Sequence, residues 1–457
     1  MSQPALDRAI GPLAAILLVI GGIIGSGIFL TTGIMATALP SPALILVAWA
    51  AGGLFALAGA LTYAELATMY PRAGGVYVYL SETFGPLPAF LYGWAMLLVA
   101  LSGGVAAVAV GFSDYLSYFF PQLSHARVLM TVPIGSTAWT LSAGQVVAVL
   151  SILFLGGVNY LGVRSGAGAN ALLTIAKMAG LVLLPIFALM SARVAPDWTP
   201  IVPATLPSPL AGFGLAMIAV LWAYDGFYFL TYSAGEVRDP VRNLPRALSW
   251  GLLTVLGLYL TVNIAYLVAL PMHELAGTSR VAERAATALV GPSGATIVSL
   301  TVVMSTLGAN AAALLGASRL LYAMAADGLF FRAAASVHPR YRSPHVAIVA
   351  LTIWASLLAL SGTYQQLFTY VVFTSVLFSL LGGLTLFRLR KTRPAAARPY
   401  RVWGYPVVPG LFVLGSALMV ANTLRERPFE SLAGLGLLVA GLPVYMYWKR
   451  KARTRRT

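Results

Sequence analysis

The sequence contains no cysteine and few charged residues. The absence of cysteine excludes disulfides, iron–sulfur clusters and thiolate zinc sites, and it excludes a disulfide-linked accessory subunit. Asp, Glu, Lys and Arg together make up only 9% of the 457 residues, whereas soluble domains contain about 25%. A chain of this length with so little charge is typical of a protein that crosses a membrane several times.

Most of the chain is apolar instead. They account for 59% of the chain, and the mean hydropathy is +0.85. The apolar runs recur to the end of the chain, so the first is not a cleaved signal peptide. With about 20 residues per span, the sequence predicts twelve transmembrane helices, near residues 11–36, 43–67, 86–112, 142–161, 168–192, 210–234, 246–270, 294–323, 344–361, 364–389, 404–423 and 432–448. We therefore expect an all-α polytopic membrane protein with one domain, residues 1–457, and no soluble domain.

The net charge of +16 is concentrated on one side of this topology. If both termini lie on the same side, most of the 29 Lys and Arg residues fall there, including those of the connector 388–401 and the tail 449–457. The positive-inside rule then predicts cytoplasmic termini in a cell membrane. The tail also suits contact with anionic lipid. This placement argues against nucleic acid as a partner.

Two of the predicted spans are interrupted by glycine. The first carries Gly-Ser-Gly at residues 25–27, and the sixth carries "LWAYDGFYFLTYSAGE" at residues 221–236. They occupy corresponding positions in two five-span halves, about 11–192 and about 210–389, and an odd number of spans inverts the second half. Paired interrupted helices of this kind indicate a transporter binding site. The spans within about 404–448 would be additions outside the repeat.

The first interruption has a specific chemistry. Gly21 and Gly25 have the spacing of a helix-packing pair, but packing does not explain three consecutive small residues, which lower helix propensity. Unwound backbone is tolerated in a bilayer only where it lines a cavity or is buried in protein. The N–H groups that begin the second half-helix suit a carboxylate, and the carbonyls before the break suit an ammonium group. Together they would hold a zwitterion.

Three charged residues within the predicted spans are candidates for function, namely the only two acids and the only lysine there. Glu65 is near the end of the second span, where a carboxylate reaching the interface explains it at least as well as a functional role. Asp225 lies in the middle of the sixth span, where a carboxylate needs a partner. Three partners are open: a substrate cation, a proton or freed backbone N–H groups. Lys177 is the only lysine within a span. Its ammonium group replaces a coupling cation or pairs with a hydroxyl such as that of Ser305, unless the span boundary is misplaced.

The sequence offers little for other classes of function. All four histidines fall in predicted loops, and no nucleophile, paired carboxylates or metal ligands can be assembled at membrane depth. We therefore expect no enzymatic activity, no metal and no cofactor. A channel would need polar rings along a pore, which the scarcity of polar residues within the spans disfavours. A sensor would need a soluble output domain.

The motifs resemble those of the amino acid–polyamine–organocation superfamily, and more narrowly its L-type amino acid transporter branch. The resemblance runs nearly from end to end. It includes "GGIIGSGIF", "TYAELATMYPRAGGVYVYLSETFG", "GVRSGAGANALLTIAK", "LWAYDGFYFLTYSAGEVRDPVRNLPRAL", "SRLLYAMAADGLF" and "RPYRVWGYP". Because animal members use a cysteine to bond an accessory glycoprotein, this chain looks like a stand-alone, bacterial-type member.

The resemblance implies a LeuT-type fold with ten core helices in two inverted repeats, broken in helices 1 and 6. It also implies sodium-independent transport of L-amino acids, commonly by obligatory exchange and alternating access. The implied substrate-binding residues are Ile24, Gly25, Ser26, Gly27, Ile28, Trp222, Ala223, Tyr224, Asp225, Gly226 and Ser375. Lys177, with Ser305 opposite, would replace a sodium site.

Some positions depart from the family pattern or leave alternatives open. Phe227 stands where tryptophan is usual, and Ala326 stands where arginine is frequent. Relatives that handle cationic as well as neutral amino acids carry aspartate at the position of Asp225, although bacterial neutral exchangers share it. A proton-coupled symporter, with Asp225 or Glu65 as the proton carrier, is the alternative to an exchanger.

Overall fold

The chain folds almost entirely into helices. The computed structural model describes residues 8–134, 137–203, 208–278, 280–361, 364–426 and 428–454. The elements of the first half are α1 (Pro12–Ile23), α2 (Gly27–Ala38), α3 (Pro42–Met69), α4 (Val76–Phe84), α5 (Pro86–Ala95), α6 (Leu101–Phe119), β1 (Val128–Ile134), β2 (Thr137–Ser142), α7 (Ala143–Tyr160) and α8 (Val163–Ser191). The remaining elements are α9 (Pro209–Tyr224), α10 (Phe229–Tyr232), α11 (Pro240–Ala269), α12 (Met272–Leu275), α13 (Val281–Val290), α14 (Pro292–Ala326), α15 (His345–Ser361), α16 (Tyr364–Thr392), α17 (Val407–Glu426) and α18 (Pro428–Thr454).

The long helices confirm a polytopic membrane protein. Among the described residues, ten helices are long and apolar enough to cross a membrane, and α9 and α15 are shorter apolar helices. Each of the twelve predicted spans overlaps one of these helices, and several helices extend beyond the predicted bounds, while the exact number of crossings stays a prediction. The sequence also determines where many helices begin: α3, α9 and α14 each carry proline in their first turn, where the missing N–H costs nothing.

Both predicted interruptions are present. α1 ends at Ile23 and α2 begins at Gly27, whereas α9 ends at Tyr224 and α10 begins at Phe229. α1 packs against α10, and α2 packs against α9. The two broken helices therefore lie beside each other in opposite directions, with their breaks at the same level of the bundle.

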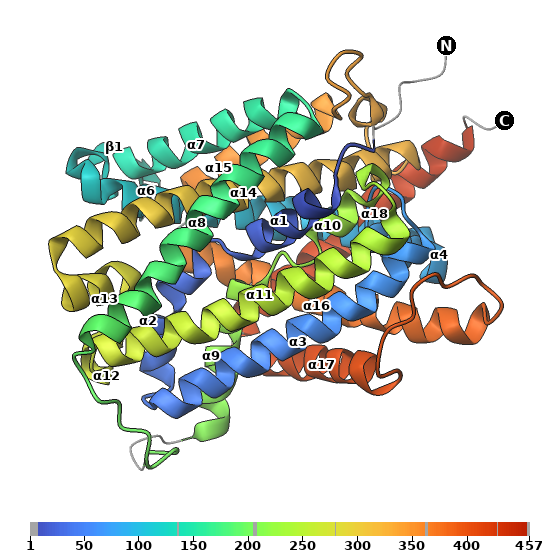
Figure 1. The fold of residues 1–457 in the computed structure, drawn as a ribbon. Coiled ribbons are helices and arrows are strands. Elements are labelled where there is room, and N and C mark those ends of the chain that lie inside the picture. The colour runs from blue at the N-terminus through green and yellow to red at the C-terminus, as the bar shows by residue number, and fades with distance from the viewer. Residues whose placement is uncertain are drawn as a thin grey trace.

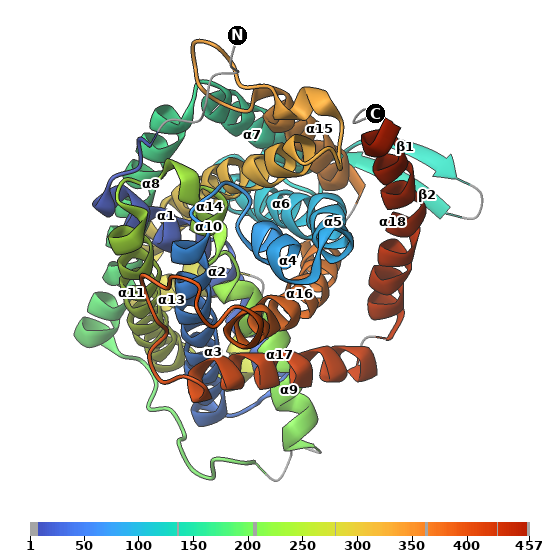
Figure 2. The same cartoon turned by 90° about the vertical axis from the view of Figure 1, so that its right-hand side faces the viewer.

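The helices form one elongated bundle (Figure 1). Both described chain ends lie at the same end of it, and Figure 2 looks along the bundle from that end. α17 and α18 lie on the outside, and in their most apolar windows only 28% and 22% of the residues are buried. The predicted basic tail continues α18 as far as Thr454, and its residues 455–457 lie outside the described part.

The segments between the helices differ from the expectation in one place. The predicted loop around 113–141 contains the end of α6 and an antiparallel hairpin of β1 and β2, so the described chain is not wholly helical. On this hairpin Val132 pairs with Trp139, whose indole N–H donates to the carbonyl of Leu360 (3.0 Å). The sequence missed the hairpin because it is short and adjoins apolar helices. The segment between the predicted spans 246–270 and 294–323 contains two short helices, α12 and α13.

The basic connector between α16 and α17 is bound to the end of α3. The buried carboxylate of Glu65 accepts hydrogen bonds from Arg390 (3.0 and 2.6 Å) and from the backbone N–H of Val402 (2.7 Å). Close by, burial raises the pKa of Glu82, but hydrogen bonds from Arg72 and Arg393 outweigh it and hold that pKa below its ordinary value. These contacts support the interpretation of Glu65 as a structural carboxylate at a helix end.

A buried ion pair joins the segment after α10 to α14. Arg319 donates to both oxygens of Glu236 (2.7 and 3.1 Å), and both side chains are 0% exposed. Sequence analysis did not predict this pair, because Glu236 and Arg319 come from distant segments of the chain.

We predict that removing one partner of this ion pair strongly destabilises the protein. Arg319→Met leaves the Glu236 carboxylate buried without its cation, which costs about 3–5 kcal/mol of unfolding free energy. Thermal unfolding of the purified protein in detergent measures the effect. The double variant Glu236→Leu/Arg319→Met should recover much of the loss. The control is Arg72→Gln in the exposed pair with Glu82, which costs at most about 1 kcal/mol. Equal losses in both single variants would contradict the prediction.

Candidate functional site

The break between α1 and α2 is held by a buried lysine. Lys177, on α8, is 0% exposed, and its ammonium group donates to the backbone carbonyls of Gly21 (2.7 Å) and Ile24. These carbonyls lie in the last turn of α1 and just beyond it, where helical hydrogen bonding runs out. The lysine therefore satisfies acceptors that the break would otherwise leave bare inside the membrane. Lys177 also lies within the apolar stretch Asn170–Ser191 of α8.

Two hydroxyl groups complete this support. The hydroxyl of Ser305, on α14, donates to the carbonyls of Ile24 (3.1 Å) and Gly25 (3.2 Å). Lys177 and Ser305 thus meet at the same carbonyl, rather than pairing directly. Tyr259, on α11, places its hydroxyl 3.2 Å from the Ile23 carbonyl and 3.1 Å from the Ala223 carbonyl. This tyrosine connects the two breaks, and sequence reasoning missed it.

The breaks contact each other through glycines. Gly226 has a φ of +99°, and a Cβ there would lie 2.6 Å from the carbonyl oxygen of Gly22. A Cβ on Gly27 would lie 2.6 Å from the Cα of Ala223. Glycine at positions 226 and 27 therefore permits a backbone approach that no larger residue allows.

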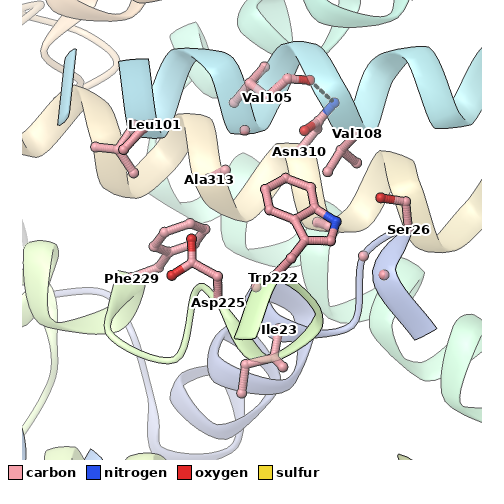
Figure 3. Close-up of a pocket in the computed structure, with 16 residues that line it drawn as sticks. Ile23, Ser26, Leu101, Val105, Val108, Trp222, Asp225, Phe229, Asn310 and Ala313 are labelled. Atoms are coloured by element: carbon pink, nitrogen blue, oxygen red, sulfur yellow. Dashed lines mark hydrogen bonds between the residues drawn. The ribbon is translucent and has the colours of Figure 1, made fainter. Parts of the chain in front are cut away.

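A cavity lies where the two breaks meet (Figure 3). About 460 Å³ of space there holds no protein atoms, including the part that opens outward. Its polar groups are the break itself, the carboxylate of Asp225, the indole of Trp222 and the amide of Asn310, which donates to the carbonyl of Val105 (3.1 Å). The lining residues come from the two breaks, from α6 with Ala100 before it, and from α14: Gly22, Ile23, Gly25, Ser26, Gly27, Ala100, Leu101, Gly104, Val105, Val108, Trp222, Asp225, Phe229, Ala309, Asn310 and Ala313.

Asp225 also faces a second, smaller cavity. That cavity is lined by Tyr224, Asp225 and Phe227 from the second break, by Ser375 and Ser379 from α16, and by apolar neighbours from α3, α9 and α16. The Asp225 carboxylate therefore stands between the two spaces, with the side chains of Tyr228 and Ser375 beside it.

The predicted site residues divide into three groups. Gly25, Ser26, Gly27, Trp222 and Asp225 line the first cavity. Tyr224 and Ser375 join Asp225 at the second cavity. The other predicted residues line neither cavity but contact the breaks. The carbonyl of Ile24 accepts from Lys177 and Ser305, and that of Ile28 accepts from Tyr266 (3.2 Å). Ala223 and Gly226 pack against the first broken helix.

Sequence reasoning missed the walls that α6 and α14 contribute. Most of these residues are glycine, alanine, valine or leucine, which carry no chemical signal in an apolar span. Asn310 is the exception, since an amide within a predicted span is a detectable signal. Phe229 was part of the quoted motif but was not singled out.

The geometry suits a small zwitterion. The first N–H groups of α2 have no partner within the helix, and this positive end of the helix dipole points into the cavity with Ser26 and Gly27. The carbonyls at the break already accept from the protein, yet each carbonyl oxygen has a second lone pair. In the part of the chain that the structure describes, no cluster of three or more His, Asp or Glu side chains has the arrangement of a metal site.

Comparison with known proteins agrees with this geometry. The family described as amino acid permease matches residues 10–431. The chain is 31% identical, over 98% of both chains, to the serine/threonine exchanger SteT of Bacillus subtilis (strain 168). It is 30% identical to the branched-chain amino acid permease BcaP of the same organism, over 98% of this chain and 94% of the relative.

A human protein is similar to about the same degree. The b(0,+)-type amino acid transporter 1 of Homo sapiens is 30% identical over 96% of this chain and 88% of its own length. The matched regions include both breaks, α6 and α14. The chain therefore belongs to the amino acid permease family of membrane transporters, within the amino acid–polyamine–organocation superfamily.

Proposed function

We propose that this amino acid transporter is a sodium-independent exchanger of neutral and cationic L-amino acids that works by alternating access. One observation carries the proposal: the broken backbone between α1 and α2 faces a cavity while a buried ammonium group, that of Lys177, holds its carbonyls. A fixed positive charge bound to backbone carbonyls does the work that a coupling cation would do. Transport then needs no sodium.

In this proposal the substrate backbone binds at the two breaks. Its carboxylate accepts from the N–H groups of Ser26, Gly27 and Ile28 at the positive end of α2. Its ammonium group lies against the carbonyls that end α1 and α9, the negative ends of two half-helices. Ile23 and Trp222 line the cavity at these ends. The amino acid side chain then extends toward α6, Asp225 and the second cavity.

The antiparallel contact between the broken helices supports an inverted repeat. α1 with α10, and α2 with α9, form a crossing that an inversion of residues 11–192 onto residues 210–389 would produce. Alternating access would then be a relative movement of the repeats around the breaks, with α17 and α18 outside. The concentration of Lys and Arg at the end that holds both termini supports a cytoplasmic position for that end.

Exchange is supported by one relative, whose name describes it as an exchanger. Proton-coupled symport remains the second candidate, because Asp225 is a carboxylate that lines the cavity. Glu65 gives symport less support, since Arg390 and Val402 occupy its oxygens and it does not line the cavity.

We predict that uptake depends on amino acid inside the vesicle. Proteoliposomes containing the purified protein are tested with the twenty amino acids outside, and with or without amino acid inside. Uptake should rise severalfold with internal substrate and should not change when choline replaces sodium. Uptake into empty vesicles that follows an imposed pH gradient would contradict exchange and favour proton-coupled symport.

We also predict that Asp225 selects cationic side chains. A charge-assisted hydrogen bond contributes about 1.5–3 kcal/mol, so Asp225→Asn should reduce arginine exchange about tenfold or more while alanine exchange changes less. The two rates are compared in the same proteoliposome preparation. Ser375→Ala is the matched control, because it alters the second cavity without removing charge. An unchanged ratio of arginine to alanine exchange in Asp225→Asn would contradict the prediction.

A further inference from the structure

A large apolar groove lies on the outside of the bundle between α3, α9 and α17. About 1530 Å³ of space between these helices holds no protein atoms, including the part that opens outward. Its walls include Leu54 and Phe55 of α3, Phe213 and Met217 of α9, and Leu411 and Leu418 of α17. Leu54, Leu411 and Leu418 are each more than half exposed. The groove therefore opens sideways into the region that membrane lipid occupies, and it is separate from the two cavities at the breaks.

The groove has one polar end. Asn422 and Arg425, one helical turn apart near the end of α17, both line it. The side-chain Nδ2 of Asn422 is buried and has no hydrogen-bond partner, while its amide packs against Gly214. The guanidinium of Arg425 is largely exposed, and Glu426 lies 3.7 Å from it. A buried, unsatisfied amide donor thus lies next to an accessible cation at one end of an apolar groove.

The spacing of these groups matches the structure of a membrane lipid. From Leu411 to Arg425 the helix rises about 21 Å, whereas one leaflet contributes about 15 Å of hydrocarbon. Arg425 is therefore at headgroup level when Leu411 is near the middle of the bilayer. Asn422 lies about 4.5 Å deeper than Arg425, where the ester carbonyls of a glycerolipid are found.

We propose that this groove is a specific binding site for one glycerophospholipid. Arg425 binds the phosphate, Asn422 donates to an ester carbonyl, and an acyl chain lies along Leu418 and Leu411. The amide and the guanidinium distinguish this site from the general layer of lipid around the bundle, which needs only apolar contact.

The groove also adjoins the transport site. Phe55 lines both the groove and the second cavity, in which Asp225 lies. α9 forms one wall of the groove and ends at the second break. A bound acyl chain therefore packs against the half-helix whose end lines the binding cavity. Lipid at this site would stabilise the position of α9.

The test measures lipid retention by the purified full-length protein. The protein is delipidated in detergent, phosphatidylglycerol is added back, and native mass spectrometry gives the bound fraction. Loss of a charge-assisted hydrogen bond predicts about a tenfold weaker binding in Arg425→Gln. Leu418→Trp, which fills the groove, should also weaken binding. Two matched controls should bind as the wild type does: Leu414→Trp, on the same helix outside the groove, and Arg193→Gln, an exposed arginine elsewhere.

A second readout guards against misfolded variants. Phosphatidylglycerol should raise the thermal unfolding midpoint of the wild type and of Leu414→Trp, but not that of Leu418→Trp. Inorganic phosphate without an acyl chain, and extra detergent without a phosphate, should each fail to reproduce the shift. Equal retention in all five proteins, or an equal shift with detergent alone, would overturn the proposal and leave only nonspecific lipid contact.

Discussion

The hydrogen bonds from Lys177 to the Gly21 and Ile24 carbonyls are the interaction on which the rest of the site depends. A helix that unwinds within a membrane leaves backbone groups without partners, and each one is costly in hydrocarbon. Here the acceptors before the break receive bonds from Lys177, Ser305 and Tyr259. Gly27, the first residue of α2, lines the cavity on the other side of the break. The protein thus satisfies the carbonyls before the break, and the proposed function places the substrate carboxylate beyond it.

The second constraint is the close packing of the two breaks. Gly22 against Gly226, and Gly27 against Ala223, bring backbone to backbone without intervening side chains. Tyr259 binds a carbonyl from each break and holds them together. Away from the cavity, other bonds tie the same elements to the scaffold: Glu236 after α10 binds Arg319, and residues 10 and 237 form a backbone bridge. The broken helices are therefore anchored both at their ends and at the breaks.

The sequence predicted the helical class, the two breaks and the burial of Lys177 because each depends on local composition. Runs of apolar residues determine the spans, and consecutive small residues determine the breaks. It did not predict what depends on tertiary contact. Tyr259 and Asn310 lie in apolar spans with nothing to show which way they face, and the β1–β2 hairpin is too short to separate from the helices beside it. The pairing of Arg319 with Glu236 was not predicted either, because the two residues come from distant segments.

The most direct test of this account concerns the contact between the two breaks. Gly27→Ala would place a Cβ 2.6 Å from the Cα of Ala223, and overpacking of this kind costs about 1–3 kcal/mol. Gly257→Ala is the matched control, since a Cβ there meets nothing within 4 Å. The measurement is amino acid exchange by each purified variant in proteoliposomes. The account predicts about a tenfold or greater loss for Gly27→Ala, with membrane insertion intact, and wild-type rates for Gly257→Ala. Wild-type exchange by Gly27→Ala would contradict it.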